Sequence, residues 1–274
     1  MKPALQIRVQ RYGWDKASAF YDDSWKEQLK PAQDRLLEMA DLESGEDVIE
    51  TACGSGLVTI RAARKVAPDG QVVATDLSDE MIRRAMSVAE EKQISNVIFL
   101  RMNAEQLDLN GRYFDAALCG LGLMYVTDPV QTLSEMHRLL KPDGRSVVAI
   151  WGERKNCGWA EIFPIVDRRV KSDVCPLFFQ QGTGNTLEHT FSQAGFTDIE
   201  VDRFNVTLSY PNEDLALMAA FSGGPVALAY DKFDEDTRAG AHEEYLDSIS
   251  EFRVGDGYEI PGEFVVAAGK KSFS

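Results

Sequence analysis

The sequence lacks several features that would assign it to common classes of protein. It has no uninterrupted apolar run of roughly 18 residues, so it offers no transmembrane helix. The first ten residues alternate polar and apolar side chains and lack the apolar stretch that a signal peptide requires. Only four cysteines occur (Cys53, Cys119, Cys157 and Cys175), and none forms a C-x-x-C pair. These absences argue against a membrane-spanning, secreted or zinc-binding protein and favour a cytoplasmic chain with free thiols.

Positive charge is also scarce. The 274 residues include 29 Lys and Arg against 44 Asp and Glu, for a formal net charge of −15. Because nucleic-acid binding depends largely on Lys and Arg, DNA or RNA is disfavoured as the main partner. The composition, with 44% hydrophobic and 27% charged residues, is that of an ordinary folded protein. The oligomeric state is left open, a homodimer being one option.

Strand and helix patterns alternate between residues 46 and 151. A helix is expected to follow the first strand, a second to begin after Ser78, and a third to begin at Thr127-Asp128-Pro129. This alternation predicts parallel βαβ units in a doubly wound sheet, with ligands at the carboxyl ends of the strands. Short apolar runs predict the strands at residues 48–52, 71–76, 97–102, 114–119 and 146–151.

The first of these strands runs into a glycine-rich turn, Gly54-Ser55-Gly56. Small residues in such a turn let the backbone approach a nucleotide closely. Asp76 ends the second strand twenty positions after Gly56, where a carboxylate can accept hydrogen bonds from ribose hydroxyls. Thr59 stands where a dinucleotide fingerprint has its third glycine, and no G-K-[ST] segment occurs, which disfavours NAD and a P-loop.

The pattern that remains, E-x-A-x-G-x-G from Glu50 to Gly56, resembles motif I of class I S-adenosylmethionine-dependent methyltransferases. Residues 103–105, 114–119 and 135–144 resemble later motifs of the same family, in the same order. The last strand resembles that of its ubiquinone/menaquinone-like and natural-product branch. Three departures are Ala52 and Asp143, each in place of a glycine, and Asn103 in place of an aspartate.

The resemblance implies a seven-stranded Rossmann-like α/β sheet, mostly parallel with its last strand antiparallel, and helical insertions that cap it. It implies S-adenosyl-L-methionine as the cofactor. The residues that it assigns to the cofactor are Tyr21, Glu50, Ala52, Gly54, Gly56, Asp76, Leu77, Met81, Asn103, Ala104, Glu105 and Cys119.

The acceptor is expected to be a small organic molecule. Residues 120–123 read Gly-Leu-Gly-Leu, so the [DNS]-P-P-[YFW] signature of DNA methylases is absent after the fourth strand. The aromatic and aliphatic content favours a quinol, a phenol or a natural-product intermediate, with the attacking atom (C, O or N) left open. Aromatic side chains that are candidates for contacting the acceptor are Tyr12, Trp25, Tyr125 and Tyr230.

Few residues are candidates for acid–base chemistry. Methyl transfer from a sulfonium needs no metal, and it needs a base only when the acceptor is protonated. Among the three histidines, His137 shares a helical stripe with leucines and His189 lies off the apolar face of its helix. His242 falls on a stripe with Ala241 and Tyr245 and is the candidate general base.

The chain is expected to have three parts: an N-terminal helical cap (1–45), a cofactor-binding core (46–151) and the rest of the core (152–274). Within the last part, residues 152–186 are expected to be irregular, and about 211–262 to form a helical lid. Two rival functions remain, namely a cofactor-binding but catalytically idle subunit and, less favoured, an NAD-dependent oxidoreductase. Labelled donor and a panel of acceptors would separate them.

Overall fold

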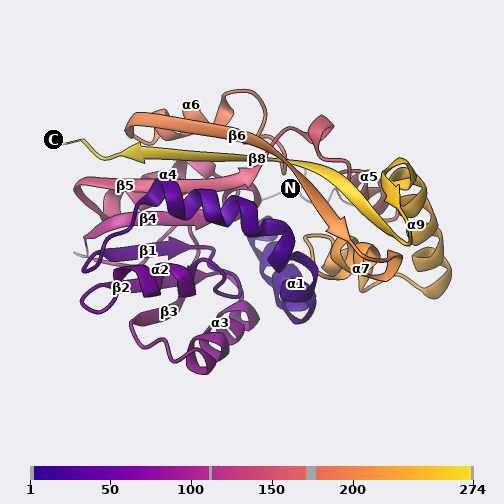
Figure 1. Cartoon of the computed structure of the whole chain (residues 1–274), viewed down its shortest axis with the longest axis horizontal. Coiled ribbons are helices and arrows are strands. Elements are labelled where there is room, and N and C mark those ends of the chain that lie inside the picture. Colours follow the sequence, from indigo (N-terminus) through magenta and orange to yellow (C-terminus); the bar gives the residue numbers. More distant parts are fainter. Residues whose placement is uncertain (1–2, 111–112, 171–176, 273–274) are drawn as a thin grey trace.

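The centre of the computed structural model is one mixed sheet, shown in Figure 1. The structure describes residues 3–110, 113–170 and 177–272. The strand order is β3-β2-β1-β4-β5-β8-β6, and a short strand, β7, pairs with β8. The strands are β1(Asp47–Thr51), β2(Gln71–Asp76), β3(Val97–Arg101), β4(Phe114–Gly120), β5(Leu140–Trp151), β6(Thr197–Tyr210), β7(Arg253–Val254) and β8(Gly257–Lys270).

The predicted doubly wound sheet is confirmed. Strands β1 to β5 are parallel, and β8 runs antiparallel to both β5 and β6. Nearly all residues of β1, β2 and β4 are buried, which explains why these strands are continuous apolar runs. The two-residue strand β7 was not predicted.

Helices flank the sheet, and α3 and α4 begin at the predicted caps. The Ser78 side chain accepts from Met81 N at the start of α3, and Asp128 accepts from Gln131 N at the start of α4. Because these helices start directly after β2 and after the loop that follows β4, their first turns lie at the carboxyl ends of the strands. The helices packed on the parallel half and beside β6 are α2(Thr59–Val66), α3(Asp79–Glu91), α4(Pro129–Leu139) and α6(Thr186–Gln193).

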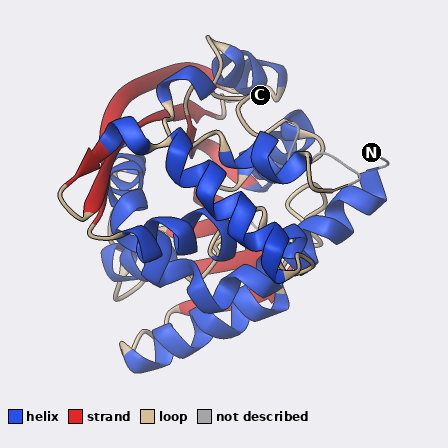
Figure 2. Cartoon of the chain, turned by 90° about the vertical axis from the view of Figure 1, so that its right-hand side faces the viewer, coloured by secondary structure: helices blue, strands red, loops and turns tan. Residues whose placement is uncertain are grey.

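A single helix, α1(Pro3–Ala40), occupies most of the segment 1–45 that was expected to be a helical cap, and it contains Pro31. Its second half is buried in the core through Leu29, Leu36 and Ala40. Its first half lies at the carboxyl ends of the parallel strands, on the right in Figure 1, and Figure 2 looks onto that end. One helix therefore belongs both to the core and to its cover.

The stretch between β6 and β8 is shorter than predicted. Residues 257–262, expected in the helical lid, belong to β8, where Tyr258 pairs with Tyr210 and Ile260 with Leu208. Here β8 has extended past the end of β5, so Pro261 lies in an edge-like position that tolerates proline. The helical elements before it are α7(Glu213–Leu217), the π-helical turn η3(Met218–Ser222), α8(Ala227–Tyr230), α9(Glu235–Ser248) and the 3₁₀ turn η4(Ser250–Phe252).

Two further boundaries differ from the predictions. β5 begins at Leu140 instead of Ser146, and its register with β4 shifts near Asp143, which has a φ of 62°. The segment expected to be irregular contains η2(Arg154–Asn156) and α5(Ile162–Asp167). The apolar residues of α5 pack into the core. η1(Leu123–Tyr125) follows β4. Cys175 lies outside the described residues. No helix in the described ranges is long and apolar enough to cross a bilayer.

Candidate active site

A cavity lies at the carboxyl ends of the parallel strands, with about 1020 Å³ of empty space when its solvent-open mouth is included. This is where open α/β sheets bind ligands. Loops that follow β1, β2, β3 and β4 line one side, and the first half of α1 lines the other. The predicted cofactor residues that line it are Tyr21, Ala52, Gly54, Asp76, Leu77, Met81, Asn103, Ala104 and Glu105.

The loop after β1 is held in left-handed backbone conformations. Gly54 has a φ of 55° and Gly56 of 87°, values that glycine adopts without strain. Ala52 also has a positive φ, 53°, although it carries a side chain. A Cβ placed on Gly122, in the loop after β4, would lie 2.4 Å from the Ala52 Cβ. The loops after β1 and β4 therefore meet with no room for a second side chain.

Asp76 is positioned to accept hydrogen bonds from a ligand. Its carboxylate accepts from Gly54 N and from Ser78 N, each at 2.8 Å. A carboxylate offers about four lone-pair sites, so acceptor capacity remains for hydroxyl groups. Burial raises the pKa of Asp76 to about 6, against the backbone hydrogen bonds that lower it. The residues present thus fit a ribose at the end of β2.

Three predicted cofactor residues do not line the cavity. Glu50 is buried beneath it, accepts from Thr59 Oγ1 at 2.5 Å, and has its pKa raised by burial to about 8. The Cys119 thiol is buried, which raises its pKa to about 11. A Cβ on Gly56 would face Ala85 of α3 at 3.2 Å. These three residues lie behind the cavity lining, in or next to the loops that form it. Their direct contact with the cofactor stays a prediction.

Glu105 connects two loops of the site. Its Oε1 accepts from Thr127 Oγ1 at 2.6 Å and from Asp128 N at 2.7 Å. Asn103 Oδ1 in turn accepts from Glu105 N at 3.1 Å. The Glu105 carboxylate therefore orders the segment that leads from Tyr125 to α4, a role that the sequence did not indicate.

Polar contacts fix the first half of α1 above the cavity. The Asp22 carboxylate accepts from Ser55 Oγ at 2.5 Å and from Arg84 Nε at 2.8 Å. This contact joins α1 to the glycine-rich turn and to α3. Tyr21, next to Asp22, lines the cavity, and burial raises the pKa of its phenol well above the usual value.

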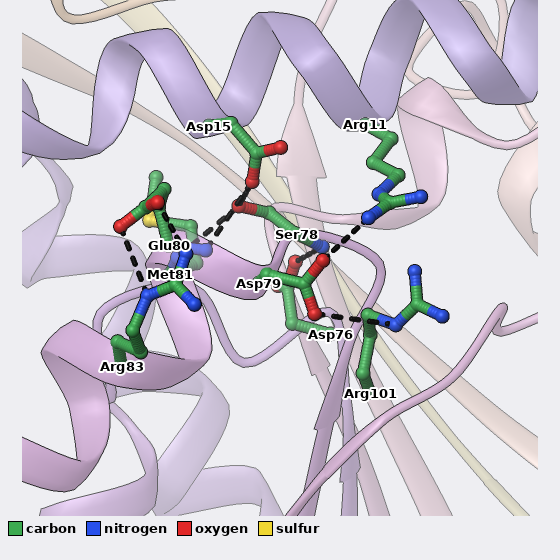
Figure 3. Close-up of polar contacts among 9 residues, drawn as sticks. All are labelled: Arg11, Asp15, Asp76, Ser78, Asp79, Glu80, Met81, Arg83 and Arg101. Atoms are coloured by element: carbon green, nitrogen blue, oxygen red, sulfur yellow. Dashed lines mark hydrogen bonds and ion pairs between the residues drawn. The ribbon is translucent and has the colours of Figure 1, made fainter.

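A second set of contacts lies two turns earlier in α1, as Figure 3 shows. Asp15 accepts from Ser78 Oγ at 2.6 Å, and Arg11 pairs with Asp79 at 2.5 Å. Asp79 also pairs with Arg101 at 3.3 Å. The start of α3, which carries the residues after Asp76, is thereby tied to α1.

Aromatic rings cover much of the remaining wall. Trp159 packs edge-on against Phe178, with ring centroids 5.6 Å apart, and its ring lies 4.8 Å from that of Trp151. Trp25 is a predicted acceptor contact, and its ring centroid lies 5.9 Å from that of Trp159. Sequence reasoning missed Trp14, Trp151, Trp159 and Phe178, all of which line the cavity. Only Trp151 carried a signal, since it ends a predicted parallel strand.

The other predicted acceptor and catalytic residues are placed differently. Tyr125 lines the cavity, whereas Tyr12 is 45% exposed on α1, and Tyr230 and His242 lie outside the lining. Tyr230 Oη and His242 Nε2 are 2.8 Å apart, and Phe221 packs against both rings. His242 therefore contacts other residues of the insertion, and this placement gives no support to a general-base role.

Charge in the cavity lining is entirely negative. Among the described residues that line it, Asp76 and Glu105 are the charged side chains, and no Lys, Arg or His is present. The site can therefore accept hydrogen bonds and favour a cation, but its described lining offers no side chain that would pair with a phosphate or a carboxylate.

Comparison with known proteins gives one consistent result. Residues 42–162 match a family described as "Methyltransferase domain". Demethylmenaquinone methyltransferase of Geobacillus kaustophilus is 27% identical over 220 residues, which cover 73% of this chain and 93% of that protein.

Two solved structures share the fold. The YcgJ protein of Bacillus subtilis aligns with a TM-score of 0.63 at 17% identity, over 89% of this chain and 100% of the other. Phosphoethanolamine N-methyltransferase 2 of Haemonchus contortus, solved with phosphomonomethylethanolamine and S-adenosylhomocysteine, aligns with a TM-score of 0.61 at 16% identity. That alignment covers 94% of this chain and 58% of the other.

Proposed function

Because the chain belongs to the class I S-adenosylmethionine-dependent methyltransferases and acts on a small molecule, we propose that its acceptor is a flat, uncharged aromatic compound of the quinol or phenol class. The observation that carries this proposal is the wall of the cavity. Trp25, Trp151, Trp159 and Phe178 line it, and no basic side chain of the described residues does. A flat ring can pack against such a wall, whereas a phosphate or carboxylate would lose its hydration without gaining a cationic partner.

The similar demethylmenaquinone methyltransferases are named for a quinone-type acceptor, which agrees with this class. The Haemonchus contortus enzyme was solved with a phosphorylated acceptor. Such an acceptor would meet Asp76 and Glu105 as the charged groups of the described lining, and both repel its phosphate. We therefore favour the quinol or phenol class over phosphorylated amines.

For the cofactor, we assign the ribose to Asp76 and the adenine to the segment around Leu77 and Asn103. When bound, S-adenosylmethionine supplies a methyl group already activated by its positively charged sulfur. What the chain itself contributes is alignment and the exclusion of water, and alignment can be worth on the order of 7–11 kcal/mol of the barrier. The small residues Ala52 and Gly122, where the two loops meet, suit the close approach of donor and acceptor.

We assign the insertion at 213–252 a supporting role in the cover over the acceptor. Its contribution to the lining is Gly224 and Pro225, and its η3 and α8 segments pack on the first half of α1. The helix α1 provides most of the cover directly, through Trp14, Tyr21 and Trp25. The lid is therefore formed by α1 and held in place by the insertion.

The proposal is tested by incubating the protein with labelled S-adenosylmethionine and matched acceptors. A naphthoquinol and a naphthol should be methylated, whereas the monophosphate ester of the same naphthoquinol, which keeps one free hydroxyl, should react at least tenfold more slowly. The phosphate ester is the matched control, because it keeps the ring and adds only charge. Equal rates with both would contradict the proposed acceptor class, and labelling of amines alone would replace it.

A further inference from the structure

Trp159 carries a buried hydrogen-bond donor that has no partner. The residue lies in the turn that leads into α5, is 4% exposed and lines the cavity. Its indole Nε1 is buried and has no hydrogen-bond partner among the described residues. Leaving such a donor unpaired is unfavourable, so buried donors in folded proteins are rarely without an acceptor. The Trp159 N–H is therefore available to an acceptor atom that the described part of the chain does not supply.

The neighbours of this indole explain why its N–H is unpaired. Aromatic rings pack around it, with centroids 4.8 to 6.0 Å from its own: those of Trp25, Trp151, Phe163, Phe178 and Phe179. A phenyl ring carries no nitrogen or oxygen, and an indole nitrogen is a donor only. The face of an aromatic ring accepts an N–H only weakly. None of these side chains can therefore accept a conventional hydrogen bond from Trp159.

The turn that carries Trp159 is fixed to its surroundings by its backbone. Gly158 N donates to Pro261 O of β8 at 2.9 Å, and Ile162 N donates to Trp159 O at 3.3 Å. A Cβ on Gly158 would lie 2.6 Å from a ring atom of Phe252, so glycine allows the turn to lie close to η4. With the backbone held, the indole ring is the part that can adjust. Side chains at binding surfaces commonly change rotamer when a ligand packs against them.

We propose that Trp159 Nε1 donates a hydrogen bond to a ring oxygen of the bound acceptor, the indole turning its nitrogen toward the cavity as the acceptor packs against the wall. This inference rests on the proposed function and adds a determinant of selectivity to it. Because the indole N–H can donate but not accept, the contact favours a carbonyl or hydroxyl oxygen over an ammonium group or a ring without oxygen. Trp159 is thus a positioning residue that sets the orientation of the acceptor ring.

The test compares two bicyclic ligands that differ only in a ring carbonyl, 1-tetralone and tetralin. Their dissociation constants are measured by ligand-observed NMR titration of the wild type and Trp159→Phe, in the presence of S-adenosylhomocysteine. Trp159→Phe should weaken binding of 1-tetralone about tenfold more than binding of tetralin, which corresponds to about 1.4 kcal/mol. In the methylation assay, the same variant should raise KM for the naphthoquinol by about the same factor and leave KM for S-adenosylmethionine within about twofold.

Trp25→Phe is the matched control, because it makes the same change in a neighbouring indole of the wall, and it should weaken binding of the two ligands by the same factor. A second variant carries benzothienylalanine at position 159, which keeps the bicyclic shape and replaces the N–H by sulfur. It should reproduce the selective loss of 1-tetralone binding, and circular dichroism should show that every variant is folded.

The proposal would be overturned if the wild type does not bind 1-tetralone, or if the variants at position 159 lose affinity for both ligands equally or for neither. The binding comparison needs no turnover, so its result is separate from a failure of the proposed function. That failure would appear as a wild type that methylates neither the naphthol nor the naphthoquinol.

Discussion

The buried carboxylate of Glu263 allows a quantitative test of how the acceptor side of the cavity is supported. Glu263 lies in β8, and its side chain is 6% exposed. Its oxygens accept from Glu153 N at 2.8 Å, from Asn156 Nδ2 at 2.8 Å and from Arg203 Nη1 at 2.5 Å. Arg203 also donates to two backbone carbonyls, those of Gly182 and Gly184. One carboxylate therefore joins β6, β8 and the segments that flank Trp159.

Replacing Glu263 with alanine removes the acceptor for all three donors at once. Breaking a buried ion pair by deleting one partner costs about 3–5 kcal/mol, because the remaining charge is left without compensation. Arg203 is 30% exposed and keeps its two carbonyl acceptors, so we expect the lower end, about 3 kcal/mol. Urea unfolding at pH 7.5 should show a lower midpoint with an unchanged m-value.

Glu259→Ala is the matched control, because Glu259 lies on the same strand and is exposed. It should change the free energy of unfolding by less than about 0.5 kcal/mol. The reasoning would be refuted by a Glu263→Ala variant whose stability lies within about 1 kcal/mol of the wild type. Such a result would mean that water replaces the carboxylate without loss.

Two further outcomes are expected. Asp76→Ala should raise the dissociation constant for S-adenosylmethionine roughly ten- to a hundredfold in calorimetry, since hydrogen bonds to a charged acceptor are lost. Because burial raises the pKa of Asp76 to about 6 and ribose hydroxyls donate to the ionised form, wild-type affinity should fall as the pH drops below about 6. An Asp76→Ala variant with the same pH dependence would place the ribose elsewhere. Replacing residues 212–254 with a two-residue turn that joins β6 to β8 should leave cofactor affinity within about threefold and abolish methylation of the acceptor, and a trimmed, folded protein that keeps its rate would contradict the supporting role of the insertion.

The parallel half of the sheet could be predicted because its signals are local. Ser78 and Asp128 act as caps within their own turns, and Asp76 ends a strand whose apolar run is continuous. Each of these features depends on a few neighbouring residues. The parallel direction of these strands and the placement of Asp76 at a carboxyl end follow from the alternation of strands and helices.

The acceptor side could not be predicted in the same way. Trp159 and Phe178 come from segments without a regular pattern, and only tertiary packing brings them beside Trp25. His242 lies on an apolar stripe, as expected, but a stripe does not reveal which neighbour it faces, and that neighbour is Phe221 of the insertion. The glycines and the proline between 257 and 262 concealed a strand that pairing with β6 stabilises.

The contact between Ala52 and Gly122 also restricts the order in which this site can change. A side chain at position 122 would collide with the Ala52 methyl group, with the two Cβ atoms 2.4 Å apart. Position 52, in contrast, can lose its methyl group first, and its φ of 53° suits glycine well. An evolutionary path that moves the side chain from one loop to the other therefore has one accessible order, through an intermediate with glycine at both positions. Residue identities at 52 and 122 should consequently be correlated among descendants of this chain, with a side chain present at one position or the other and not at both.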